Sequence, residues 1–150
     1  MILRRAGLYD MPELALLYRA TVRRHLPFLP ELHTPQDERT WFCERLFADF
    51  DVWVAQDGKL LLGYIAFRGG FINHLFLDAD RLGQGVGSAL LALAKEEYAE
   101  LGLWTFQQNT RARAFYERHG FTALRFTDGD DNEEHMPDVF YVWKRSDVTS

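Results

Sequence analysis

Three glycines at alternate positions separate two regularly patterned segments of the chain. Gly83, Gly85 and Gly87 follow a β-rich run at 69–78 and precede an apolar run with helical spacing, in RLGQGVGSALLALA (81–94). Glycine lets a backbone approach a ligand closely, and the first amides of a helix have no partner within the helix. The segment therefore predicts a strand, a tight turn and a helix whose N-terminus is open to a phosphate.

The glycine spacing disfavours two common nucleotide-binding motifs. A dinucleotide fingerprint needs Gly-x-Gly-x-x-Gly, but its last position is Ser88 when counted from Gly83 and Leu90 when counted from Gly85. A triphosphate loop needs a lysine, and the segment contains none. A nucleotide-binding protein is therefore disfavoured, whereas a glycine-rich turn without any ligand remains an alternative.

Length and charge restrict the class of protein. The chain has 150 residues and a formal net charge of −5. This length predicts one domain over residues 1–150, and the acidic balance argues against a nucleic-acid partner.

The one cysteine, Cys43, lies in the apolar helical stretch TWFCERLF and is expected to pack there. No Cys/His spacing indicates a metal, and the N-terminus lacks an apolar run for a signal peptide or membrane span, so we expect a cytoplasmic protein.

Hydrophobic periodicity and turn residues indicate the order β-α-α-β-β-β-α-β-α-β-β, which is an α/β chain with a mixed sheet. Asp10 with Glu13 is expected to cap the first helix, Thr34 to begin the second, and Gly102 to end the third. Strands are expected over 2–7, 51–56, 59–67, 69–78, 103–108, 121–127 and 138–145, and helices over 9–25, 34–47, 86–101 and 110–119.

A second motif, NTRARAFYERHGF (109–121), follows the next expected strand. Together, GQGVGSALL and N..A..FY...GF resemble the GCN5-related N-acetyltransferases (GNAT family), which use acetyl-CoA. The resemblance is strong over 71–121. Gly85 and Gly87 match the family pattern Arg/Gln-x-x-Gly-x-Gly/Ala, whereas Leu82 stands where the family has Arg or Gln.

The resemblance implies a single α/β (α+β) domain with a twisted, mostly antiparallel sheet of six to seven strands and four helices. It also implies two parallel central strands that splay apart around acetyl-CoA, the acyl donor. The amides of 84–88 would meet the pyrophosphate, the backbone of 75–77 would hold the pantetheine arm, and a free amide near Phe76 would polarise the thioester carbonyl. The implied donor-binding residues are Leu75, Phe76, Leu77, Leu82, Gln84, Gly85, Val86, Gly87, Ser88, Asn109, Ala112 and Tyr116.

Two side chains are candidates for proton transfer. The resemblance places Tyr116 where the family often has a general acid, which would protonate the leaving thiolate; the alternative is that Tyr116 only packs beside Phe115. On the strand before the glycines, His74 can act as a base and Asn73 cannot. Strand alternation predicts that only one of these two faces the acceptor, and His74 is alternatively a hydrogen-bonded structural residue.

The resemblance implies that the acceptor amine meets two connections. The acidic segment DNEEHMPD (131–138) contains Glu133 and Glu134, and is either a rim that attracts a cation or a solvated hairpin. The proline-rich segment RRHLPFLPELHTP (23–35) follows the first helix. Together with Asn73, the candidate acceptor-binding residues are His25, Phe28, His33, Glu133 and Glu134.

The sequence therefore predicts an N-acetyltransferase that moves acetyl from acetyl-CoA to a primary amine in a direct ternary complex. The acidic segment favours a small cationic amine as acceptor. The alternative function is a non-catalytic acyl-CoA binding or sensing domain on the same fold. Relatives often dimerise, and the aromatic strand DVFYVWK (138–144) is available for a homodimer contact.

Overall fold

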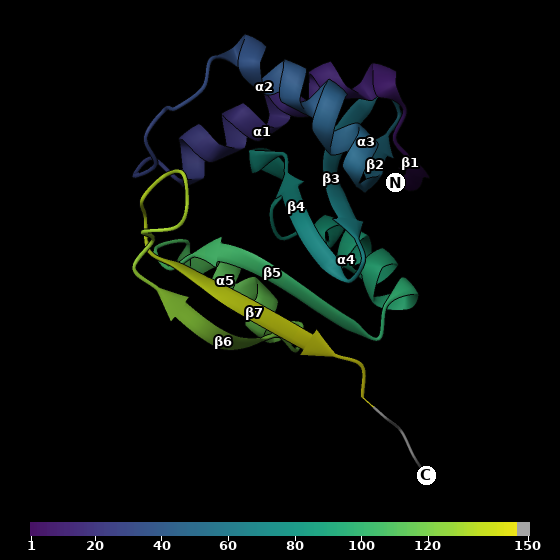
Figure 1. Cartoon of the computed structure of the whole chain (residues 1–150). Helices are drawn as coiled ribbons and strands as arrows, with labels where there is room; N and C mark the ends of the chain where they lie inside the picture. Colours follow the sequence, from purple (N-terminus) through teal and green to yellow (C-terminus); the bar gives the residue numbers. More distant parts are fainter. Residues whose placement is uncertain (147–150) are drawn as a thin grey trace.

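A twisted sheet of seven strands in the order β1-β2-β3-β4-β5-β7-β6 forms the centre of the molecule (Figure 1). This computed structural model describes residues 1–146. Every neighbouring pair is antiparallel except β4 and β5, which run parallel, so the mixed, mostly antiparallel sheet is confirmed. The strands are β1 (Ile2–Arg5), β2 (Asp51–Asp57), β3 (Leu60–Arg68), β4 (Phe71–Leu77), β5 (Glu100–Phe106), β6 (Thr122–Thr127) and β7 (Asp138–Lys144).

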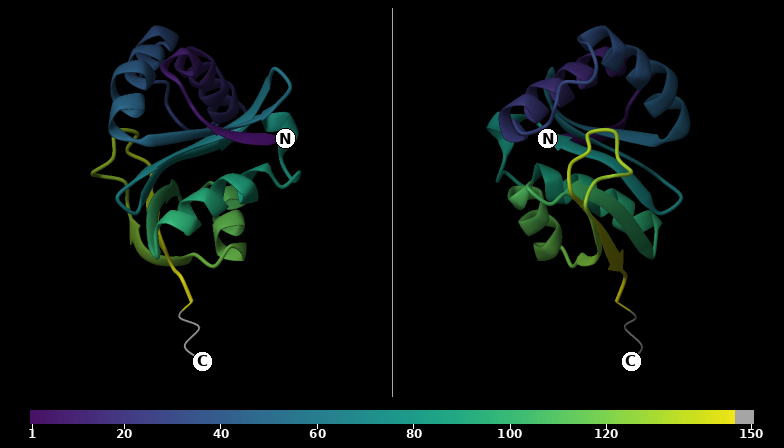
Figure 2. Two further views of the ribbon diagram at one scale, coloured as in Figure 1. Left: turned by 90° about the vertical axis from the view of Figure 1, so that its right-hand side faces the viewer. Right: turned by 60° about the vertical axis from the view of Figure 1, so that its left-hand side comes forward.

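Helices cover both faces of the sheet (Figure 2). They are α1 (Met11–His25), α2 (Pro35–Trp41), α3 (Phe47–Asp49), α4 (Val86–Glu97) and α5 (Thr110–Arg118). A π-helical turn over Phe42–Leu46 joins α2 to α3, so these two form the single helix that the sequence predicts. The expected order of strands and helices is confirmed.

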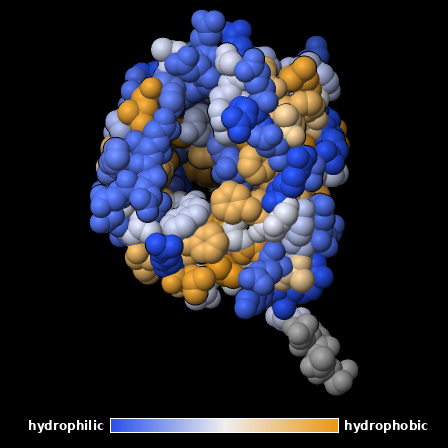
Figure 3. All heavy atoms as spheres, in the orientation of Figure 1, coloured by the Kyte–Doolittle hydropathy of each residue, from blue (hydrophilic) through white to orange (hydrophobic). Residues whose placement is uncertain are grey.

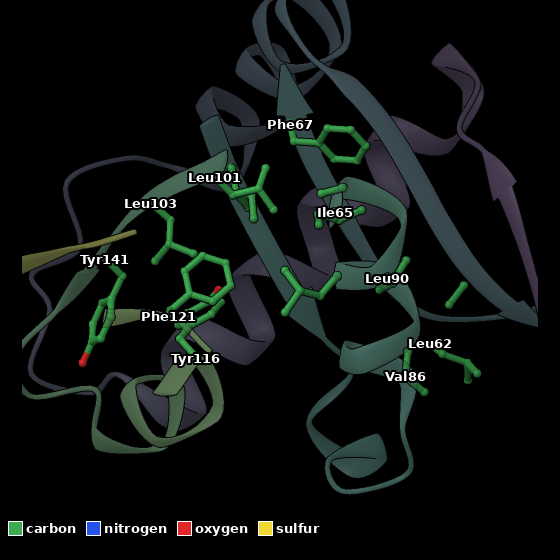
Figure 4. Close-up of a cluster of buried hydrophobic side chains, with 14 of the residues drawn as sticks. Leu62, Ile65, Phe67, Val86, Leu90, Leu101, Leu103, Tyr116, Phe121 and Tyr141 are labelled. Atoms are coloured by element: carbon green, nitrogen blue, oxygen red, sulfur yellow. The ribbon is translucent and has the colours of Figure 1, made fainter. Parts of the chain in front are cut away.

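The core consists of two clusters, one on each face of the sheet. Met11, Leu14 and Phe42 pack against β2 and β3 on the α1 face, and the partly buried Cys43 packs there as expected. The larger cluster lies between the sheet and the helices α4 and α5, and a part of it is drawn in Figure 4. Because it takes residues from β3, β4, β5 and β7, it joins the two halves of the sheet on that face.

Two local predictions are wrong, and tertiary contacts explain both. Helix α4 ends at Glu97, and Gly102 lies inside β5, where a Cβ atom would stand 2.6 Å from the ring of Phe140. The carboxylate of Asp10 does not cap α1; it accepts two hydrogen bonds from Arg4, of 2.8 and 2.9 Å, and one from the Gly7 amide. The predicted start of α2 is confirmed, because Thr34 caps it.

The parallel strands β4 and β5 diverge, as the resemblance implies. They pair at Phe71 and Gly102, where the Gly102 amide donates to the Gly70 carbonyl at 2.8 Å. Beyond this point the two strands separate (Figure 1). The register between β3 and β4 also shifts after the Ala66–His74 pair, which makes Asn73 the extra residue of a β-bulge. The middle of β4 is thus a sheet edge inside the molecule.

Candidate active site

The N-terminus of α4 is open to a ligand. Gly85 is its N-cap residue at φ 81°, and no side chain caps the helix. The first bond of the helix runs from the Ala89 amide to the Gly85 carbonyl, so the amides of 86–88 have no partner within α4. A Cβ atom on Gly83 or Gly85 would meet nothing within 4 Å. Glycine therefore suits both positions because each adopts a left-handed backbone conformation, and this conformation turns the free amides toward solvent.

Gly87 has a different role from its neighbours. A Cβ atom there would lie 3.2 Å from the ring of Phe115, so the missing side chain lets α4 approach α5 closely. Ser88 supports the same contact, because its Oγ is 3.0 Å from Nε2 of His119. Gln84 is exposed beside this turn, and Leu82 is half-buried. The glycine segment thus combines an open helix end with tight helix packing.

The free edge of β4 presents backbone groups to the gap beside β5. The amide of Asp78 donates to the Leu62 carbonyl on β3 at 2.8 Å. Because backbone groups of alternate residues point to the same side of a strand, His74 and Phe76 also direct theirs to β3. Leu75 and Leu77 therefore direct theirs toward the gap, so the free amides next to Phe76 are those of its two neighbours.

The resemblance assigns one residue at the start of α5 and one within it to the donor site. Asn109 is the N-cap residue of α5, and its Oδ1 accepts a bond of 3.2 Å from the Ala112 amide. Tyr116 is 8% exposed and packs against Phe121, with 5.4 Å between ring centroids (Figure 4). Burial raises the pKa of the Tyr116 phenol, which keeps the hydroxyl protonated at neutral pH but makes it a weaker acid than an exposed phenol.

Three neighbouring pockets share lining residues, and the space-filling view shows a hollow near the centre of the face drawn in Figure 3. The inner pocket, of about 480 Å³, lies between α1, α2 and β4. The sheet pocket, of about 470 Å³, lies over β5, and the helix pocket, of about 280 Å³, lies between α1 and the loop that follows it. Asn73 lines the inner and sheet pockets, and Glu134 lines all three.

Aromatic side chains surround the ring of His74. Its ring stacks on Tyr18 and Trp41 at 5.1 and 5.4 Å between centroids, and its Nδ1 is 2.9 Å from the hydroxyl oxygen of Tyr64. Burial lowers the pKa of His74 to about 3, because the packed rings disfavour the charged imidazole. A neutral imidazole with this pKa is a poor base for an alkylammonium.

Asn73 and His74 both line the inner pocket, contrary to the alternation that the sequence suggests. The β-bulge at Asn73 explains the difference, since an extra residue interrupts the regular switch between faces. The Oδ1 of Asn73 is buried and has no hydrogen-bond partner within residues 1–146. A buried acceptor without a partner is unfavourable, and a donor on a bound molecule would satisfy it.

The acceptor residues expected from the two connections are only partly brought together. His33 and Glu133 line the inner and helix pockets, and a contact of 2.6 Å between them joins the two connections. Phe28 packs edge-on against Phe106 of β5, with centroids 6.2 Å apart. His25 lies at the end of α1 and lines none of the three pockets.

The sequence reasoning missed the α2 wall of the inner pocket. Asp37, Glu38 and Trp41 line it, together with Tyr18 of α1. The spacing of Asp37, Glu38 and Trp41 could have indicated this wall, because residues three and four apart lie on one face of a helix.

Among residues 1–146, no group of three or more His, Cys, Asp or Glu side chains is arranged to hold a metal ion, and no helix has the length and apolarity to cross a membrane.

Diverging parallel strands, with an open helix N-terminus beside the gap between them, are the arrangement that the resemblance to acyl-CoA-dependent N-acetyltransferases implies. Comparison with known proteins agrees. The model of the acetyltransferase (GNAT) domain matches residues 48–123, just over half of the chain. The chain belongs to the GNAT acetyltransferase family, and the predicted family and enzyme class are confirmed.

A curated relative supports this membership, and two solved structures share the fold. A peptidyl-lysine N-acetyltransferase of Salmonella typhimurium, YjaB, is 32% identical over 99 residues, which are 63% of this chain and 68% of the relative. The solution structure of apo YjaB from Escherichia coli covers 97% of this chain and all of that chain, with TM-score 0.80 and 23% identity. The structure of yncA from Salmonella typhimurium with acetyl-CoA covers 100% and 96%, with TM-score 0.71 and 15% identity.

Proposed function

We propose that this protein transfers acetyl from acetyl-CoA to the terminal amine of a lysine side chain in a peptide or protein. One observation carries the proposal: the strands diverge directly after Phe71 and Gly102, and expose the backbone edge of β4 between an open helix end and acid-lined pockets. YjaB, which matches this chain, is named a peptidyl-lysine N-acetyltransferase. A small cationic amine is the second candidate, because acidic residues attract either acceptor.

The donor fits the side of the gap next to α4. Acetyl-CoA supplies the acetyl group as a thioester and departs as a thiol. The amides of 84–88 bind its pyrophosphate, because they lack partners and the helix dipole favours negative charge there. The backbone groups of Leu75 and the amide of Leu77 bind the pantetheine arm, and one of these amides polarises the thioester carbonyl; the Leu77 carbonyl is already bonded to the Thr21 hydroxyl at 2.8 Å. The side-chain N–H groups of Asn109, whose Oδ1 is occupied by the Ala112 amide, add a donor to the same arm.

The acceptor fits the side of the gap next to the pockets. Asn73 accepts a hydrogen bond from the amine through its unpartnered Oδ1. Glu133 and Glu134 attract the ammonium, and Tyr18 and Trp41 provide an apolar wall for its alkyl stem. Tyr116, at the position of the family's general acid, is the residue we assign to protonate the departing sulfur, although its raised pKa disfavours proton release.

An acetyl-CoA turnover assay over a panel of amines tests this function. Free thiol is expected only when an amine is added, and lysine-containing peptides are expected to exceed free polyamines and amino acids in kcat/KM. The reverse order would favour the small cationic amine. Thermal stabilisation by CoA without thiol release from any amine would contradict catalysis and support an acyl-CoA sensor. NAD and ATP, as controls, are expected to give no stabilisation.

A further inference from the structure

Glu134, in the loop between β6 and β7, lies where the three pockets meet. It lines the inner, sheet and helix pockets, whereas Asn73 lines the first two. Asn73 follows two residues after Phe71, the point at which β4 and β5 separate. Its unpartnered Oδ1 therefore marks the junction between the pockets and the open edge of β4. A group that enters any of the pockets and reaches this junction passes Glu134.

Within residues 1–146, Glu134 is also the carboxylate of the inner pocket that makes no hydrogen bond or ion pair to another residue. It is half-buried. The other three inner-pocket carboxylates are held: Glu38 by Arg19 at 2.9 Å, Glu133 by His33 at 2.6 Å, and Asp37 by the Thr34 amide at 3.1 Å. A carboxylate without such a partner is available to bind and receive a proton.

The surroundings of Glu134 also favour proton uptake over permanent charge. Burial, and then the neighbouring Glu133, raise the pKa of the Glu134 carboxyl. A raised pKa brings a carboxylate closer to the range in which a general base works at neutral pH. The alternative base, His74, has a pKa lowered to about 3, and its Nδ1 is already bonded to Tyr64. Electrostatics and geometry therefore favour the same residue.

We propose that the Glu134 carboxylate is the general base that deprotonates the acceptor ammonium, while Asn73 Oδ1 orients the amine. The assignment rests on the proposed function. One proton passes from the ammonium to Glu134 and then to solvent. The neutral nitrogen forms the bond to the acetyl carbon as the carbon–sulfur bond breaks. The second proton passes from the nitrogen to solvent through the same carboxylate. The departing sulfur takes a proton from Tyr116, and solvent returns a proton to the Tyr116 phenolate, so the products are an amide, a thiol and one released proton.

Several titratable or charged groups share these pockets, and a pH test must separate their protonation from that of Glu134. They are Tyr18, Arg19 and Arg23 of α1, Glu31 and His33 of the following loop, Asp37 and Glu38 of α2, His74 of β4, Arg125 of β6, Asp131 and Glu133 of the same loop, and Asp138 of β7. A Glu134→Gln substitution leaves all of them in place. A change in the pH profile between the two proteins therefore reports on Glu134.

The test compares Glu134→Gln with Asp130→Asn, which removes an exposed charge from the same loop and lines none of the three pockets. Glu134→Gln is expected to lower kcat by about a hundredfold or more at pH 7, with little change in the KM for acetyl-CoA. Its kcat/KM is expected to rise tenfold per pH unit up to the pKa of the amine, because hydroxide and bulk water then remove the proton. Asp130→Asn is expected to keep the wild-type rate and profile.

Two outcomes would overturn the assignment. One is a Glu134→Gln enzyme with the wild-type pH profile and a kcat within about threefold of wild type. The other is a raised acceptor KM at unchanged kcat, which would make Glu134 a binding residue only. If the Gln variant does not fold, Glu134→Asp replaces it: a base role predicts a lower kcat with the wild-type pH dependence, and full activity would refute it. A wild-type enzyme that acetylates no amine would instead refute the proposed function itself.

Discussion

The partly buried His74, packed among aromatic rings, makes the stability of this protein sensitive to acid. Its pKa is about 3 in the folded protein, whereas an unfolded chain has a histidine pKa of about 6.5. Above pH 6.5 the imidazole is neutral in both states, so it adds no pH dependence. Between pH 6.5 and 3 the unfolded chain binds a proton that the folded protein does not bind. Stability is therefore complete above the unfolded pKa and is lost as the pH falls.

The size of this loss follows from the same two values. Each pH unit below 6.5 costs about 1.4 kcal/mol, so pH 4.5 costs up to about 3 kcal/mol relative to pH 7.5. That is a large part of a total folding stability of about 5–15 kcal/mol. The cause is local, since the ring lies between Tyr18 and Trp41 and bonds to Tyr64.

Urea unfolding at pH 7.5 and 4.5 measures the effect in wild type and in His74→Gln, which does not titrate. The Gln variant is expected to be less stable at pH 7.5 because it loses ring contacts, but to lose about 2–3 kcal/mol less than wild type on acidification. His135→Asn removes an exposed histidine and is expected to behave as wild type. Equal acid losses in wild type and His74→Gln would refute the argument, because the carboxylates common to both would then account for the whole effect.

Two further predictions concern the donor side. Gly85→Ala is expected to cost about 1–2 kcal/mol of stability from the left-handed backbone at φ 81°, and to weaken CoA binding. Gly87→Ala is expected to displace Phe115 and to lower the melting temperature. Calorimetric titration with CoA separates a loss of CoA affinity from a loss of stability. Unchanged CoA affinity in both variants would contradict the phosphate site. Tyr116→Phe is expected to lower kcat at least about tenfold with a nearly constant KM for acetyl-CoA. Unchanged turnover would refute a general-acid role and leave Tyr116 a packing residue.

Local patterns in the sequence were sufficient for the order of strands and helices. Alternation, helical spacing and turn residues act over a few positions, so they are readable without a partner. The start of α2 at Thr34 and the open turn at Gly85 are of this kind. The family resemblance supplied the splayed strands, which no local pattern encodes.

Gly102 and Asp10 show where local reading fails. Gly102 follows an apolar helical pattern, yet its missing side chain accommodates the ring of Phe140 on the neighbouring strand. Asp10 has the position of a helix cap, yet Arg4 offers its carboxylate a charged partner at 2.8 Å. In both cases a contact between separate elements outweighs a local preference, and such a contact depends on strand register and on which elements meet.

The sequence by itself determined the elements, the glycine turn and the two motifs that identify the family. Tertiary structure alone decided the site: the β-bulge at Asn73, the contact between His33 and Glu133 across 100 positions, and the place of Glu134 at the junction of three pockets. The physical reason is that each depends on burial and on the pairing of distant segments. These quantities exist only once the chain is folded, and they set which carboxylate is free and which histidine stays neutral.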